Sequence, residues 1–130
     1  ACFGEQSLGW LGQRDDGSCF TSAHALAAHV QEALGREVTV LGEMHTPIHK
    51  IAWCSGGAQS YFEAAIAAGA DAFITGEISE PQIHLARECG VAFIAAGHHA
   101  TERYGAPAVA EYLAQEHGLE HHFINIDNPA

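Results

Sequence analysis

Residues 51–95 read IAWCSGGAQSYFEAAIAAGADAFITGEISEPQIHLARECGVAFIA, and short apolar runs alternate in this stretch with segments of helical character. The runs at 51–54, 71–75 and 91–95 are apolar through most of their length, as strands covered on both faces are. Segments 59–68 and 80–89 between them are predicted helices. Strands that alternate with helices need crossover connections, which predicts a largely parallel or mixed sheet covered by helices. We therefore expect an α/β fold.

The chain before this stretch begins the same alternation. A short strand near Trp10 and a β-branched strand at 37–41 flank a predicted helix. Thr21 or Ser22 can cap the start of that helix, and Gly35 suits its end. These elements extend the predicted α/β pattern toward the amino terminus.

The carboxyl-terminal part predicts one more helix and one more strand. The helix runs to about His117, and the strand lies around 122–126 and is expected to join the same sheet near 123–126.

Within the central stretch, Ser79 and Gln82 match the reciprocal capping pattern of a helix start. Because no linker, repeat or low-complexity segment interrupts the chain, residues 1–130 are expected to form a single α/β domain.

The composition excludes several classes of protein. Five basic residues face sixteen acidic ones, a net charge of −11, whereas a general nucleic-acid binder or a protein of anionic membranes needs a basic face. The 48% of hydrophobic residues argues against disorder. Apolar stretches such as 64–70 are too short to span a membrane. Because no signal peptide is visible, a cytoplasmic location is expected.

Cysteine usage points to the same compartment. The four cysteines stand far apart, with neither a CxxC pair nor zinc-ribbon spacing. An even count allows two disulfides, but Cys54 and Cys89 lie in or beside apolar runs, where free thiols are common. Reduced thiols are the expectation, with two disulfides as the alternative.

Candidate functional residues gather where the predicted strands end. In open α/β sheets, ligands bind beyond the carboxyl ends of the strands. Three such ends carry CSGG at 54–57, TGEIS at 75–79 and GHHATE at 97–102. The first is a glycine-rich turn that either cradles a phosphate through backbone N–H groups or is a plain tight turn. It lacks the Walker lysine and the GxGxxG pattern, so it indicates no nucleotide site by itself.

The third segment predicts a metal site. His98 and Glu102 are four residues apart, so on a helix they share a face and can bind one ion. A neutral imidazole with a carboxylate suits zinc, iron, manganese or nickel. The alternative is a helix start with an acidic residue and exposed histidines. Pro107 favours a helix that starts near Gly105, which leaves the two candidate ligands in a looser turn.

Glu77, at the second strand end, is the candidate catalytic residue. It is a general base, a partner that orients a metal-bound histidine, or a solvated acid. Because Glu77 and His98 follow parallel strands at the same edge, we expect them to lie close together. Ser79 is expected to act as a helix cap. The histidines without a comparable arrangement are expected at the surface or at an interface: His45, His49, His84, His121 and His122.

A family resemblance is carried by three strings, AWCSGGAQSYFEAAIAAGADAFITGEISE, HLARECGVAFIAAGHHATERYG and FINIDNP. They resemble the carboxyl-terminal half of the GTP cyclohydrolase 1 type 2 homologue family, also called NGG-interacting-factor-three-like. The resemblance runs in order from about Gly9 to Ala130; GHHATER is its most specific motif, and CSGGAQ and ITGE support it. It implies that this chain is one half of a two-part interlocked α/β fold.

The same resemblance implies a dinuclear metal centre and a toroidal homohexamer. The GHHATE motif of the family supplies a histidine and a glutamate, which match His98 and Glu102. The remaining ligands of the family, a paired-histidine motif and an aspartate, come from an amino-terminal half that these 130 residues do not contain. The chain alone is therefore expected to hold an incomplete site for divalent ions.

The resemblance also implies an activity. The family name indicates hydrolytic opening of the GTP imidazole ring, so a nucleotide is the expected substrate. Two ions roughly 3.5–4 Å apart can generate hydroxide, polarise the substrate and neutralise triphosphate charge. The alternative is a non-enzymatic metal-binding or interaction protein that assembles as a ring. Turnover of GTP by a metal-loaded form separates these two functions.

Overall fold

One mixed sheet organises the computed structural model, which describes residues 2–3, 8–42, 45–126 and 128. The strand order in the described chain is β1-β2-β4-β5-β6-β3. The strands are β1 (Cys2–Phe3), β2 (Gly9–Gly12), β3 (Thr39–Leu41), β4 (Ile51–Cys54), β5 (Ala72–Thr75) and β6 (Ala92–Ala95). β4, β5 and β6 are parallel neighbours, whereas β2 and β3 pair antiparallel with β4 and β6. The predicted α/β class with a mixed sheet is confirmed.

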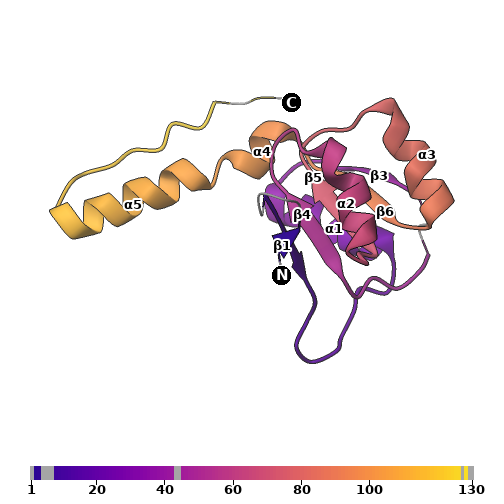
Figure 1. Cartoon of the computed structure of the whole chain (residues 1–130). Coiled ribbons are helices and arrows are strands. Elements are labelled where there is room, and N and C mark those ends of the chain that lie inside the picture. The colour runs from indigo at the N-terminus through magenta and orange to yellow at the C-terminus, as the bar shows by residue number, and fades with distance from the viewer. Residues whose placement is uncertain (1, 4–7, 43–44, 127, 129–130) are drawn as a thin grey trace.

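Helices cover both faces of this sheet (Figure 1). The helical elements are α1 (Ala23–Leu34), the 3-10 helix η1 (Gln59–Tyr61), α2 (Phe62–Ala67), α3 (Glu80–Cys89), α4 (His98–Glu102) and α5 (Gly105–His117). α2 and α3 pack on one face, and α1 packs on the other. Successive residues of a strand point to opposite faces, which explains why Phe73 belongs to the first cluster and Ala72 to the second.

Three phenylalanines form the centre of the layer under α2 and α3. Phe62, Phe73 and Phe93 are fully buried, and their ring centroids are 5.0–5.8 Å apart. Such offset and edge-to-face pairs stabilise a core beyond simple burial, by roughly 0.5–1.5 kcal/mol each. The prediction that Phe73 and Phe93 are buried in one sheet is confirmed.

Helix ends follow the local sequence as predicted. Ser22, rather than Thr21, caps α1: its hydroxyl accepts a hydrogen bond from the Ala25 N–H at 3.1 Å. Gly35 ends α1 with φ of +68°, a conformation that favours glycine. At the start of α3, Gln82 Oε1 accepts from the Ser79 N–H at 3.0 Å, within the predicted capping box.

The predicted strand around 122–126 is wrong. Residues 119–126 have no regular secondary structure, and the side chains of Phe123, Ile124 and Ile126 are exposed. α5 carries the chain away from the sheet, and the tail returns along α5 instead of reaching a sheet edge (Figure 1). The apolar residues of the tail were therefore not evidence for pairing with this sheet.

The GHHATE segment is more regular than expected. It forms the short helix α4, and Pro107 lies in the first turn of the separate helix α5, where its missing N–H costs little. His98 and Glu102 therefore share a helical face instead of a loose turn. No helix in the described ranges is long and apolar enough to cross a membrane.

Candidate metal centre

Three loops meet at the carboxyl ends of β4, β5 and β6. The parallel register places Cys54, Thr75 and Ala95 side by side, so the following residues leave the sheet at one edge. Backbone hydrogen bonds continue past the strands: Gly76 N donates to Gly56 O, and Gly97 N donates to Gly76 O, both at 2.9 Å. This ladder holds the three sequence-predicted segments together.

Gly76 allows these backbones to approach closely. A Cβ at this position would lie 2.6 Å from the Gly56 carbonyl oxygen and 2.7 Å from the His98 Cα. Real Cβ atoms do not make such contacts with backbone, which can shift little in a packed turn. A glycine is therefore needed between the CSGG turn and the start of α4.

Two threonines fix the loops further. Thr75 is fully buried; its hydroxyl donates to Gly56 O at 3.1 Å and accepts from Ala58 N at 3.3 Å. Thr101 Oγ1 accepts from Gly56 N at 2.9 Å, and this bond ties α4 to the turn after β4. Sequence patterns did not single out either threonine, because these partners lie in the loop after β4, which is distant in sequence from both.

His98 lies between two carboxylates. Its Nδ1 is 2.5 Å from Glu77 Oε1, and its Nε2 is 3.1 Å from Glu102 Oε2. An ionised carboxylate only accepts hydrogen bonds, so the short contact requires a proton on Nδ1. The predicted closeness of Glu77 to His98 is confirmed, and α4 brings His98 and Glu102 together. All three side chains are between 39% and 51% exposed, so ligands can reach them.

Electrostatic interactions within this group change its protonation. The hydrogen bond to Glu77 raises the pKa of His98. Desolvation lowers this pKa, but the negative charge of Glu102 raises it further. The same hydrogen bond lowers the pKa of Glu77. Nearby, burial raises the pKa of Cys54, and the Glu102 charge adds to the effect. Without a bound cation, the site therefore favours a protonated imidazole beside charged carboxylates.

The CSGG turn forms the floor of the site. A Cβ on Gly56 would lie 2.1 Å from Glu102 Oε1 and 3.1 Å from His98 Nε2, and Gly56 has φ of +69°. A Cβ on Gly57 would lie 3.3 Å from the Glu77 carboxylate. The two glycines thus leave room for the side chains of the site. The Gly56 N–H already donates to Thr101 Oγ1, which favours the tight-turn interpretation of CSGG over a phosphate cradle.

The donor set fits part of a metal site. His98 Nε2 and Glu102 converge, and Glu77 on Nδ1 provides the hydrogen bond that metal-bound histidines usually make. Among the described residues, no group of three or more His, Cys, Asp or Glu side chains is placed to hold an ion. The pair therefore needs further donors to form a tight site.

The other candidate histidines do not join this group. His99 points elsewhere, and its Nε2 is 3.2 Å from Asn125 Oδ1. The rings of His24 and His45 are 6.1 Å apart, on a different part of the chain. The following are exposed, as predicted: His45, His49, His84, His121 and His122.

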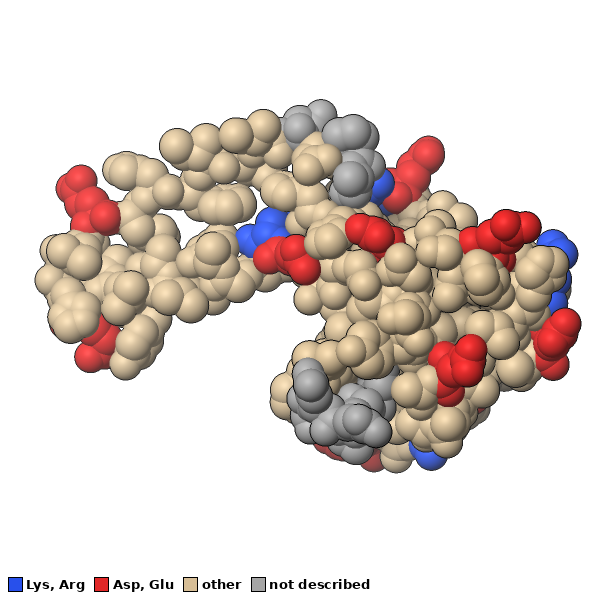
Figure 2. Space-filling model, turned by 45° about the horizontal axis from the view of Figure 1, so that its top comes forward, with Lys and Arg blue, Asp and Glu red and all other residues tan. Residues whose placement is uncertain are grey.

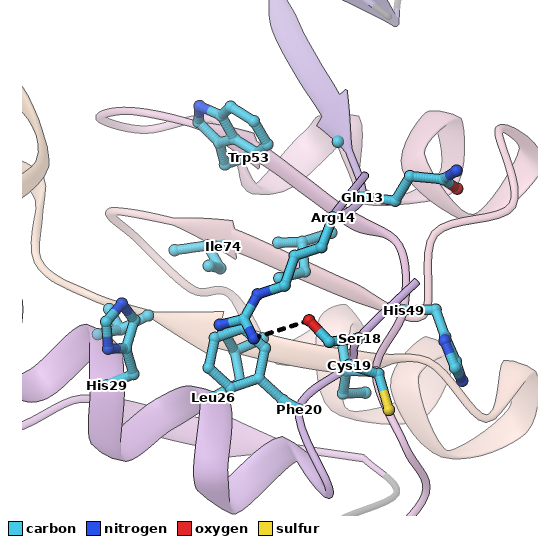
Figure 3. Close-up of a pocket in the computed structure, with 14 residues that line it drawn as sticks. Gln13, Arg14, Ser18, Cys19, Phe20, Leu26, His29, His49, Trp53 and Ile74 are labelled. Atoms are coloured by element: carbon cyan, nitrogen blue, oxygen red, sulfur yellow. Dashed lines mark hydrogen bonds between the residues drawn. The ribbon is translucent and has the colours of Figure 1, made fainter. Parts of the chain in front are cut away.

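A separate pocket of about 410 Å³ lies on the α1 face of the sheet (Figure 3). Trp53 and Ile74 from the sheet, and Leu26 from α1, give it apolar walls. Arg14 lies across it, over the Phe20 ring, and donates to Ser18. The pocket contains none of the three residues of the candidate metal centre, so we assign it no chemistry.

Acidic side chains are scattered over the face drawn in Figure 2, and the chain has only five basic residues against sixteen acidic ones. The net charge of −11 attracts cations and repels anions. Long-range electrostatics therefore favour the approach of a cation over that of an anion.

These features define an α/β protein with a histidine–carboxylate group at the carboxyl edge of its parallel strands. A family model described as Duf34/NIF3 (NGG1p interacting factor 3) matches residues 3–129. The chain belongs to this family.

Relatives of known name agree with this assignment. A GTP cyclohydrolase 1 type 2 homolog of Pseudomonas aeruginosa is 58% identical over 104 residues, 80% of this chain and 41% of that protein. One from Neisseria meningitidis is 50% identical over 128 residues, 98% of this chain and 50% of that protein. A solved structure described as protein ybgI, of unknown function, is 42% identical to this chain, with a TM-score of 0.86. The match covers 95% of this chain and 49% of the chain in that structure. This chain spans about half the length of these relatives.

Proposed function

We propose that this chain carries one side of the divalent-metal centre of a hydrolase of the GTP cyclohydrolase 1 type 2 kind. His98 and Glu102 are the metal ligands, and Glu77 orients His98. The observation that carries the proposal is the Glu77–His98–Glu102 contact, in which one ring nitrogen is held and the other faces a second carboxylate.

Divalent ions at such a centre supply a Lewis acid and an activated water, and they neutralise the phosphate charge of a nucleotide. That neutralisation matters here, because a chain of net charge −11 repels GTP. The protein's own part is to hold the ring and carboxylate in place, with the backbone of Gly56 beneath them. Zinc, iron, manganese and nickel all suit the imidazole–carboxylate pair.

Glu77 is proposed as a positioning residue. A general base works best when its pKa is near the operating pH. The hydrogen bond from His98 lowers the pKa of Glu77 instead, which makes its carboxylate a weaker base. The same bond is what an orienting partner provides.

Further donors are proposed to come from outside the described side chains. Because the described residues bring only two donors together, a two-ion site needs a neighbouring chain or a longer form of the protein. A homo-oligomeric ring, the hexamer that the family resemblance implies, would supply neighbours. The free thiols of Cys19, Cys54 and Cys89 fit a protein of the reducing cytoplasm, where we propose that it acts.

The second candidate function is a non-enzymatic metal-binding or interaction protein that assembles as a ring. The incomplete donor set favours it, because a centre that needs a neighbour to close can report assembly or metal supply. The name NGG1p interacting factor 3, attached to the family, also describes partner binding.

Metal loading and GTP turnover distinguish these functions. We would load the chain with zinc, iron, manganese or nickel in turn, and follow GTP and its products by chromatography. A hydrolase predicts metal-dependent loss of GTP that His98→Ala and Glu102→Ala abolish, while the control His84→Ala keeps it. Metal binding without turnover would support the alternative. Absence of any metal binding that depends on His98 would reject both.

A further inference from the structure

Gln59, the first residue of η1, connects the candidate metal centre to α3. Its Nε2 donates to Glu77 Oε2 at 3.4 Å and to Ser79 Oγ at 3.3 Å. Its backbone carbonyl accepts from Gln82 Nε2 at 3.1 Å. The residue is therefore fixed at both its backbone and its amide.

One atom of the Gln59 amide is buried without a hydrogen-bond partner among the described residues, which costs stability. Its Oε1 is buried and has no hydrogen-bond partner within the described part of the chain. An unpaired buried acceptor destabilises a fold. Turning the amide over would bring Oε1 against the Glu77 carboxylate, and two acceptors repel each other. The observed orientation keeps the N–H on Glu77 and leaves the oxygen unpaired.

The Glu77 carboxylate is thus held at two points. Oε2 accepts from Gln59, and Oε1 accepts from His98. Two carboxylates compete for the single N–H of a neutral His98 ring, because Glu102 faces Nε2. Only a ring protonated on Nδ1 leaves the Nε2 lone pair available to a metal. Whatever fixes Glu77 therefore also favours the metal-binding form of the ring.

We propose that Gln59 is a positioning residue of the candidate metal centre. It fixes the carboxylate of Glu77 and, through it, keeps the proton of neutral His98 on Nδ1. The effect on metal affinity rests on the proposed function, whereas the effect on the ring tautomer belongs to the metal-free chain.

The test compares Gln59→Met and Gln59→Glu with Ser79→Ala. Methionine has a similar length and no donor, and glutamate has the same shape and repels Glu77. Ser79→Ala removes the other acceptor of the amide and a helix cap, but leaves the bond to Glu77. It is therefore the control for a merely structural effect.

Nitrogen NMR of the His98 ring is the main measurement, made on the metal-free chain at alkaline pH, where the imidazole is neutral. We expect the Nδ1–H form to dominate in the wild-type chain and in Ser79→Ala, and its ratio to the Nε2–H form to fall several-fold in both Gln59 variants. Zinc affinity, measured by calorimetry, should fall roughly 3–10-fold, less than the 10–100-fold typical of a direct partner of the ligand.

Two results would overturn this inference. One is an unchanged tautomer ratio in both Gln59 variants with only a lower melting temperature. The other is an equal change of the ratio in Ser79→Ala. A wild-type chain that binds no zinc would instead count against the proposed function, and the tautomer ratio would still decide the role of Gln59.

Discussion

His98 Nδ1 lies 2.5 Å from Glu77 Oε1, and this contact joins the ends of two neighbouring parallel strands. Each residue changes the other: the pKa of His98 is raised and that of Glu77 is lowered, chiefly by this hydrogen bond. The contact lies at the surface, so it contributes little to the stability of the fold. Its main consequence is the orientation of the His98 ring.

Glu77→Gln is expected to weaken metal binding far more than folding. The amide keeps the size of the side chain but removes the charge that supports His98, and loss of such a partner typically costs 10–100-fold in metal affinity. The melting temperature should change by only a few degrees, because the side chain is 46% exposed. Calorimetric titration with zinc and a thermal melt measure the two quantities. A large fall of the melting temperature with unchanged zinc affinity would show that Glu77 has a structural role.

Gly56→Ala is expected to block the site directly. The added Cβ would lie 2.1 Å from Glu102 Oε1, so the carboxylate must move away from His98. A non-glycine residue at φ of +69° also costs about 1–2 kcal/mol of stability. Zinc affinity should therefore fall by at least an order of magnitude, together with a measurable loss of stability.

Gly35→Ala is the matched control for that substitution. Gly35 has nearly the same φ, +68°, and an added Cβ would meet nothing within 4 Å. Both variants should lose similar stability in urea unfolding, whereas only Gly56→Ala should lose metal. Equal metal affinity in the two would mean that the CSGG turn does not support the ligands.

Much of this site could be predicted from the sequence because the geometry of parallel strands is regular. Once 51–54, 71–75 and 91–95 are strands of one sheet, their carboxyl ends must meet, and His98 and Glu77 follow. The roles of Gln59 and Thr101 could not be predicted, since each depends on a loop about 18 or 45 residues away.

The structure of the tail, residues 119–126, could not be predicted from the sequence. Its apolar residues at 123, 124 and 126 favour a strand, but composition does not supply a neighbouring strand to pair with. α5 leads away from the sheet, and the tail returns along α5 as far as His99 without pairing with a strand, so Phe123, Ile124 and Ile126 remain exposed. The path of the preceding helix, which depends on tertiary structure, determined the outcome.

The acid–base behaviour of the metal-free chain follows from the two pKa shifts. The pKa of Glu77 is lowered in the folded chain, so Glu77 stabilises the fold at pH values above the ordinary pKa of glutamate, about 4.3. This stabilisation is lost as the pH falls through the pKa that Glu77 has in the folded chain. The pKa of His98 is raised in the folded chain, so His98 stabilises the fold at pH values below the ordinary pKa of histidine, about 6.5. This stabilisation is lost as the pH rises through the pKa that His98 has in the folded chain. The pair therefore contributes most between these two pH values.

Metal affinity should rise with pH because the ion competes with a proton for His98 Nε2. Since the pKa of His98 is raised, the affinity should reach its plateau at a higher pH than an ordinary histidine would require. In Glu77→Gln the plateau should move to lower pH, even though the affinity there is weaker. Zinc titrations over a series of pH values measure both quantities, and an unchanged plateau position would contradict the assignment of His98 as the ligand.

The completeness of the donor set leads to a prediction about the chain as a whole. Each missing ligand removes a bond and also the negative charge that offsets a dication, so a centre with only His98 and Glu102 keeps several exchangeable waters. We expect the 130-residue chain, as a monomer, to bind divalent metal weakly, and to bind it more tightly where a neighbouring chain lends donors. Joining it to an amino-terminal segment that carries two histidines and an aspartate should give tight binding of two ions.

Calorimetry on both forms, with the oligomeric state of each measured by sedimentation, tests this expectation. The control for the joined form is the same segment with both histidines changed to alanine, which should return the affinity to that of the short chain. Because Glu102→Ala removes one of the two donors on this side, it should weaken metal binding by the joined form. Two tight sites on the short monomeric chain would mean that donors beyond His98 and Glu102 already lie within it, and that the ligand assignment is incomplete.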